Sequence, residues 1–184
     1  MRVITGKYGG RRFTVPSTFK ARPTTDFAKE NIFNVLRAYI DFEATRALDL
    51  FAGTGAITLE LLSRGCPLVV SVEQDRQHFR FIAETLRSLS DKAARPLCTD
   101  ALRYVSRCTE RFDLVFADPP YALPTLPELP DRILRGDTLA TGGLLLLEHG
   151  AANDFSGHPD FLDGRAYGSV HFSFFRKNLN SIDH

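Results

Sequence analysis

The chain has 184 residues, of which 43% are hydrophobic and 24% are charged, and its formal net charge is +1. This length and composition are typical of one globular domain with a sizeable core. Without a run of eighteen apolar residues they argue against a membrane protein.

Cysteine usage and the amino terminus indicate a cytoplasmic protein. The N-terminal residues lack the apolar core of a signal peptide, so export is not expected. The three cysteines are odd in number and show no CxxC pairing, and the five histidines are scattered. We therefore expect no disulfide framework, no metal site and a reducing compartment.

The charge is unevenly distributed along the chain. Residues 1–37 contain eight basic and two acidic side chains, a net charge of +6, whereas the remaining residues sum to −5. Such asymmetry favours either a basic arm that meets a polyanion or a solvated surface hairpin.

The first forty residues form a predicted extension. Two β-prone runs, residues 1–8 and 11–16, flank Gly9-Gly10, which is a hairpin signal. Asp26 can cap a helix over residues 27–40, whose apolar residues recur at helical spacing. We therefore expect residues 1–40 to form a basic hairpin, a loop and an amphipathic helix.

From residue 46 the pattern becomes strand, turn and helix. The expected strands are 46–52, 68–73, the run leading to Asp100, 112–117 and 142–149, and the expected helices are 56–65, 76–89 and 101–108. Because the strand runs are continuously apolar, they predict a mostly parallel central sheet with helices on both faces. Residues 166–177 alternate loosely and predict a closing antiparallel strand or hairpin at the edge.

Acidic residues follow successive strands of this sheet. Gly53-Thr54-Gly55 lacks the third glycine of a dinucleotide fingerprint, which argues against NAD. Glu73 is placed to accept two ribose hydroxyls, since Asp75 is better suited to cap the next helix. Asp100 is a candidate for an adenine amino group or for a helix cap. Asp49 is a candidate for a ligand ammonium group or for a buried turn acid.

A second motif, Asp118-Pro119-Pro120-Tyr121, ends the strand 112–117. A plain proline turn explains it, and so does a rigid grip on a planar amino group. In the second interpretation, Asp118 and the Pro119 carbonyl each accept one N–H hydrogen of an exocyclic amine, and Tyr121 stacks on the base.

Together these motifs resemble the class I S-adenosylmethionine-dependent methyltransferases that alkylate exocyclic amines. The motifs are DLFAGTG, VSVEQD, CTDAL and DPPY, in that order. The further segments RVITGKYGGRR and ARPTTDFAKENIFNVL resemble the bacterial family that methylates a guanine N2 amine in 16S ribosomal RNA. The resemblance implies a Rossmann-like α/β fold with residues 41–184 as the methyltransferase domain, and S-adenosyl-L-methionine as cofactor.

The resemblance also implies a role for individual residues. The cofactor would contact Asp49, Phe51, Ala52, Gly53, Thr54, Gly55, Glu73, Asp100 and Ala101. The target base would contact Asp118, Pro119, Pro120 and Tyr121. The RNA would contact Arg2, Lys7, Arg11, Arg12, Arg22, Thr24 and Thr25.

We therefore predict a monomeric, cytoplasmic enzyme that methylates guanine N2 in 16S ribosomal RNA or in a small-subunit particle. An adenine-N6 methyltransferase uses the same tetrad, although it usually carries a target-recognition region for which 184 residues leave little room. Two further candidate functions are a nicotinamide dehydrogenase and a non-catalytic RNA-binding module on the same fold.

Overall fold

The computed structural model describes residues 1–19 and 25–178, so the predicted roles of Arg22 and Thr24 lie outside the described residues. The chain divides into two compact units, Met1–Ala101 and Leu102–His184. The predicted domain boundary at residue 40 stays a prediction. No helix in the described part of the chain is long and apolar enough to cross a membrane.

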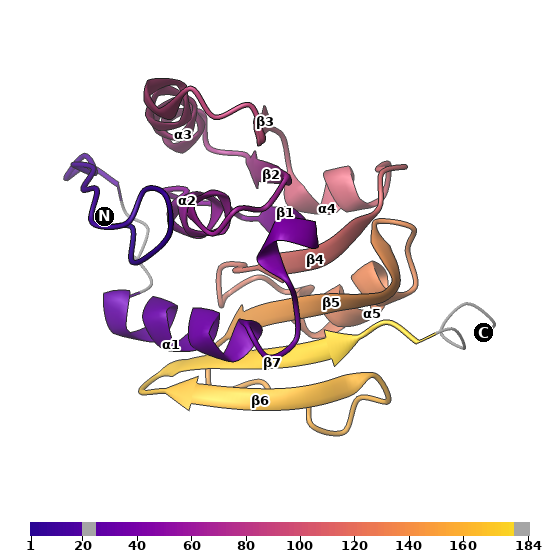
Figure 1. The fold of residues 1–184 in the computed structure, drawn as a ribbon. Coiled ribbons are helices and arrows are strands. Elements are labelled where there is room, and N and C mark those ends of the chain that lie inside the picture. Colours follow the sequence, from indigo (N-terminus) through magenta and orange to yellow (C-terminus); the bar gives the residue numbers. More distant parts are fainter. Residues whose placement is uncertain (20–24, 179–184) are drawn as a thin grey trace. The chain divides into compact units, whose positions relative to one another are not determined.

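The first unit contains a parallel three-stranded part of the sheet, in the order β3-β2-β1 (Figure 1). Its strands are β1 (Arg46–Leu50), β2 (Leu68–Glu73) and β3 (Ala94–Cys98). Helix α2 (Ala56–Ser63) packs on β1 and β2, and α3 (Arg76–Leu89) packs on β2 and β3. A short 3₁₀ helix, η1 (Phe42–Ala44), precedes β1. The predicted strand–turn–helix order is confirmed here.

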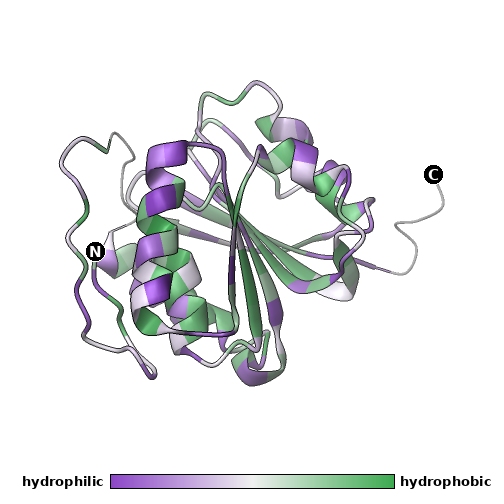
Figure 2. Ribbon diagram, turned by 90° about the horizontal axis from the view of Figure 1, so that it is seen from above, coloured by the Kyte–Doolittle hydropathy of each residue, from purple (hydrophilic) through white to green (hydrophobic). Residues whose placement is uncertain are grey.

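Burial explains these elements. Strand β2 is buried at five of its six positions, as expected for a strand covered on both faces. Helix α3 buries Ile82, Thr85 and Leu86 and exposes its charged side. Figure 2 shows this difference as mainly hydrophobic strands beside helices of mixed character.

The N-terminal hairpin is fixed to the side of α2. Arg2 and Arg12 are antiparallel bridge partners, and this bridge is the extent of regular pairing in residues 1–19. The buried Glu60 carboxylate of α2 accepts from the backbone N–H groups of Ile4 (2.8 Å) and Thr5 (3.2 Å). A Cβ atom at Gly6 would lie 1.9 Å from the Ser63 carbonyl oxygen. The close docking therefore requires glycine at this position.

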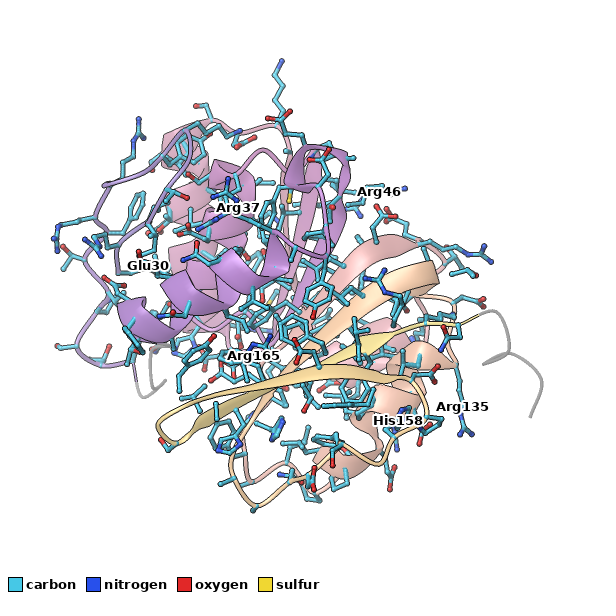
Figure 3. The ribbon with its side chains drawn as sticks, turned by 60° about the horizontal axis from the view of Figure 1, so that its bottom comes forward. Glu30, Arg37, Arg46, Arg135, His158 and Arg165 are labelled. Atoms are coloured by element: carbon cyan, nitrogen blue, oxygen red, sulfur yellow. The ribbon has the colours of Figure 1, made fainter. Side chains whose placement is uncertain are left out.

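Helix α1 (Asp26–Leu36) follows the hairpin and differs from the prediction at both ends. The N-cap is Thr25, whose Oγ1 accepts from Ala28 N at 3.1 Å, and not Asp26. The Asp26 carboxylate is instead 3.1 Å from Arg2 Nε. Residues 37–39 form hydrogen-bonded turns in which Ala38 N donates to the Val35 carbonyl and Tyr39 N to the Leu36 carbonyl. The helix therefore ends at Leu36 and does not reach residue 40. Figure 3 labels the exposed Glu30 of α1 and the exposed Arg37, which caps its carboxyl end.

The second unit continues with strands in the order β4-β5-β7-β6. These are β4 (Phe112–Ala117), β5 (Leu139–His149), β6 (Phe161–Tyr167) and β7 (Val170–Arg176). Strands β4 and β5 are parallel, β7 is antiparallel to β5, and β6 is antiparallel to β7 (Figure 1). The prediction of a closing antiparallel strand or hairpin is confirmed as a hairpin, which begins earlier than residue 166, at Phe161. Helix α4 (Ala101–Val105) begins at the boundary between the units and is shorter than expected.

Residues 126–134 form two short helices that the sequence pattern did not predict. They are η2 (Leu126–Glu128) and α5 (Leu129–Leu134), which packs on β5. Asp131 of α5 lies 3.0 Å from Arg135 and 3.4 Å from His158, and Figure 3 labels both of these basic residues. The His158 contact links the segment after β5 to α5, whereas the Arg135 pair lies at the end of α5 itself.

Candidate functional site

The turn after β1 has an unusual backbone. Phe51, Gly53 and Gly55 have φ values of 61°, 56° and 77°, in the left-handed region. Two glycines adopt this region without steric cost, but Phe51 is strained there by roughly 1–3 kcal/mol. The turn closes tightly, since Gly55 N donates to the Ala52 carbonyl at 2.7 Å. Such strain is typical of a loop shaped for a ligand.

Glu73 at the end of β2 holds this turn in place. Its Oε2 accepts from Gly53 N at 2.8 Å and its Oε1 accepts from Asp75 N at 2.7 Å. A carboxylate has about four acceptor positions, so each oxygen retains one for a ligand hydroxyl. Asp75 caps α3 through Gln77 N and His78 N, as predicted. The predicted ribose carboxylate is thus also the brace of the glycine turn.

Asp49 is a fully buried acid bonded to α2. Its Oδ2 accepts from Thr58 N at 2.9 Å and from Thr58 Oγ1 at 2.6 Å. Loss of hydration on burial raises the pKa of Asp49 to about 7, the Thr58 hydrogen bonds oppose this rise, and the nearby Glu73 charge adds to it. This geometry is that of the buried turn acid. The ligand role of Asp49 stays a prediction.

The remaining predicted cofactor residues lie beside Glu73. The strand register pairs Glu73 with Cys98 at the end of β3, and Thr99 N donates to the Glu73 carbonyl at 3.1 Å. The half-buried Asp100 then immediately precedes the buried Ala101, where α4 begins. The structure therefore brings the glycine turn, Glu73 and Asp100 to one edge of the three-stranded part of the sheet.

The tetrad Asp118–Tyr121 follows β4 in the second unit. Asp118 is half-buried and Pro119 is buried, whereas Pro120 and Tyr121 are exposed. The Pro120 carbonyl accepts from Leu123 N at 2.8 Å, so the tetrad does open a turn. Tyr121 nonetheless keeps 41% of its surface accessible, which is unusual for a large aromatic residue.

Two neighbours of Tyr121 were not predicted from the sequence. The Tyr121 hydroxyl donates to Glu148 Oε1 at 3.2 Å, and the ring lies against Gly150. Glu148 lies at the carboxyl end of β5, as Glu73 does in β2, so the pattern of acids at the ends of parallel strands was the signal that would have found it.

Five of the seven predicted RNA contacts fall within the described residues, on the hairpin or at the start of α1, and their side chains differ in surroundings. Arg2 pairs with Asp26, and Lys7 Nζ is 2.8 Å from Asp91, which raises the Lys7 pKa. Arg11 lies over the Tyr8 ring at 5.4 Å. A hollow of about 440 Å³ is lined by Met1, Arg2, Arg12, Phe13, Thr14, Val15 and Asp26. Thr25 is occupied as the α1 cap.

No group of three or more metal-ligating side chains gathers among residues 1–19 and 25–178. The expectation of a metal-free site stays a prediction.

Parallel strands, a glycine turn and acids at the strand ends define a Rossmann-like class I methyltransferase fold. The solved structure of the putative methyltransferase yhhF from Escherichia coli has the same fold, with a TM-score of 0.82 at 28% identity, over 97% of this chain and 98% of that one. The predicted fold class is confirmed.

Sequence comparison narrows this class to a family. The family model described as Conserved hypothetical protein 95 matches residues 1–176. The ribosomal RNA small subunit methyltransferase D of Escherichia coli K12 is 32% identical over 153 residues, 83% of this chain and 76% of the relative. The putative rRNA methyltransferase YlbH of Bacillus subtilis is 36% identical over 153 residues, 81% of this chain and 82% of the relative. The chain belongs to this family of small-subunit ribosomal RNA methyltransferases.

Proposed function

We propose that this protein transfers a methyl group from S-adenosylmethionine to the N2 amine of a guanine in 16S ribosomal RNA. The observation that carries the proposal is the family match over residues 1–176 in a chain that retains a characteristic strand-end motif in each unit. These motifs are the glycine turn held by Glu73 and the exposed Tyr121 after Asp118.

The cofactor residues suit an adenosyl ligand. Each Glu73 oxygen accepts one backbone hydrogen bond and retains an acceptor position for a ribose hydroxyl. A Cβ atom at Gly53 would meet nothing closer than 3.9 Å, so the turn leaves space beside its backbone. When bound, S-adenosylmethionine supplies a methyl group that is already activated by its positive sulfur. The chain itself then needs to orient the amine and accept its surplus proton.

The tetrad residues orient the amine. An aromatic amine is a poor nucleophile because its lone pair is delocalised into the ring. Hydrogen bonds from its two N–H groups to Asp118 and to the Pro119 carbonyl favour a pyramidal nitrogen with a directed lone pair. The fixed φ of proline keeps that carbonyl still, which is a form of preorganisation. Asp118 also takes up the surplus proton as the new N–C bond forms.

RNA binding is assigned to the basic N-terminal hairpin. Arg11 and Arg12 are both exposed, and their charges are not neutralised by an ion pair within the described residues. Arg2 forms an ion pair with Asp26, and Lys7 forms one with Asp91. Phosphate contacts of this kind position an RNA, whereas the target base is selected at the tetrad after it leaves its stack. Such work belongs to the cytoplasm, where ribosomes assemble.

The test is nucleoside mass analysis of small-subunit particles at several assembly stages after incubation with S-adenosylmethionine. N2-methylguanine supports the proposal, and N6-methyladenine contradicts it. RNA binding without cofactor affinity would instead favour a non-catalytic module. Asp118→Ala should lower methyl transfer by about a thousandfold or more, since it removes an orienting acceptor at the reacting nitrogen. Cofactor affinity, measured by calorimetry, should survive, and full turnover in this variant would refute the mechanism.

A further inference from the structure

The Tyr121 ring is held at its hydroxyl although its surface is open. Tyr121 is 41% exposed, whereas Glu148, which accepts from its hydroxyl at 3.2 Å, is only 5% exposed. The strand register pairs Ala117 with Leu147, so the next residues of the two parallel strands, Asp118 and Glu148, follow at matching positions. An exposed aromatic ring is thus anchored by a buried carboxylate next to the tetrad.

The ring has a second support at Gly150. A Cβ atom built on Gly150 would lie 3.0 Å from Tyr121 Cδ2 and 3.4 Å from Cε2. This is tighter than ordinary van der Waals contact, so even one added methyl group must displace the ring by a few tenths of an ångström. Gly150 has no left-handed φ, so glycine is needed here for space and not for backbone conformation.

His149 in turn fixes the Gly150 peptide. His149 Nδ1 lies 2.9 Å from the Gly150 carbonyl, and Nε2 lies 2.8 Å from Ser173 Oγ on β7. Because a carbonyl only accepts, Nδ1 carries the hydrogen, and Nε2 accepts from the Ser173 hydroxyl. Burial lowers the pKa of His149, and this favours the same neutral form. Phe155 packs edge-on against the imidazole at 5.0 Å.

We propose that Glu148 and Gly150 are positioning residues that set the plane of the Tyr121 ring for stacking on the target base. A tyrosine side chain has two torsions, and a hydroxyl anchor together with a packed edge restrains both. The incoming base then meets a ring that is already ordered, so less side-chain freedom is lost on binding. This inference rests on the proposed function, because it assigns stacking to Tyr121.

The first experiment tests whether residue 148 acts as a hydrogen-bond acceptor or through its negative charge. Glu148→Ala should lower kcat/KM for RNA roughly 3- to 10-fold through the lost restraint of Tyr121, with KM for S-adenosylmethionine unchanged. Glu148→Gln keeps an acceptor oxygen and should rescue most of that loss. In a Tyr121→Phe background, which lacks the hydroxyl, Glu148→Ala should have little further effect. Equal damage by Gln and Ala would show that the negative charge itself is required, and it would overturn the positioning role.

The second experiment uses a matched pair of glycines after β5. Gly150→Ala should lower kcat/KM for RNA by a similar factor, because the new methyl group displaces the ring. Gly157→Ala should not, since a Cβ atom there meets nothing within 4 Å. Equal kcat/KM for the two variants would contradict the assignment of Gly150.

A spectroscopic readout keeps the inference independent of activity. The chain has five tyrosines, so incorporated 3-fluorotyrosine gives few fluorine resonances, and Tyr121→Phe identifies the one from Tyr121. Gly150→Ala and Glu148→Ala should shift that resonance, and Gly157→Ala should not. An unmoved resonance in the first two variants refutes the positioning role even if methylation proceeds. A shifted resonance in a protein that does not methylate guanine refutes the proposed function alone.

Discussion

The two strand-end motifs differ in how their residues are held. In the first unit, Glu73 is 8% exposed and both of its oxygens accept from backbone N–H groups. In the second unit, Tyr121 is 41% exposed and contacts Glu148 and Gly150. The first motif fixes a backbone shape around a carboxylate, whereas the second presents a ring to solvent. The proposed function matches this difference, since it assigns a cofactor of constant shape to the first motif and a base that leaves its RNA stack to the second.

Removing the Glu73 carboxylate should weaken ligand binding more than truncating Tyr121 does. Under the proposed function, Glu73→Ala deletes both proposed ribose acceptors and should weaken S-adenosylmethionine binding about 100-fold, since each lost hydrogen bond contributes about 1–1.5 kcal/mol. The unpaired Gly53 and Asp75 N–H groups should also lower the melting temperature. Calorimetry and thermal denaturation measure the two effects. Asp75→Ala is the control, because it removes the α3 cap and leaves the carboxylate intact. Unchanged cofactor affinity in Glu73→Ala would contradict the ribose role.

Truncating Tyr121 should affect RNA and not the cofactor. Tyr121→Ala removes the proposed stacking platform and should raise KM for RNA roughly tenfold, in line with about 1–3 kcal/mol per stacked base. S-adenosylmethionine affinity should stay within error of the unchanged protein. Steady-state kinetics with each substrate varied in turn would check this. A parallel loss of cofactor affinity would show that the two motifs do not bind their ligands independently.

The smallest expected effect is a pH dependence of cofactor affinity that comes from the Asp49 carboxylate. The pKa of Asp49 is raised from 3.8 to about 7, so its carboxylate gains charge as pH rises through neutrality. If the carboxylate meets the ligand ammonium group, cofactor affinity should rise several-fold, and by at most about tenfold per pH unit, between about pH 6 and 7.5.

The variant Asp49→Asn tests this assignment by calorimetry across the same pH range. Asparagine keeps an acceptor for Thr58, so the fold should persist while the pH dependence disappears. The stability of the folded protein should change with pH in the opposite direction to cofactor affinity. A raised pKa favours the protonated folded state, so the ligand-free protein should lose this contribution as pH rises from about 4 to 7. A flat affinity profile in the unchanged protein would leave Asp49 as a turn acid only.

The sequence predicted structure best where the determining residues are close together in the chain. The apolar run 68–73 matches β2, and Asp75 caps α3 as its position predicted. The prediction was wrong where a residue distant in the chain determines the local structure. Asp26 was expected to cap α1, but Arg2 binds it and Thr25 takes that position. The short helix α5 (Leu129–Leu134) was also missed, because six residues with a proline carry little helical periodicity.

Residue order alone is enough to identify the chemical groups at each strand end. A glycine turn, an acid after each strand and the tetrad Asp118–Tyr121 are readable from residue order, because parallel strands present their carboxyl ends at one edge. Only the tertiary structure decided how those groups are held. Glu73 braces Gly53 twenty residues earlier, and Glu148 anchors Tyr121 twenty-seven residues earlier. Such contacts depend on which strands become neighbours, and that is set by packing of the whole sheet and not by any local pattern.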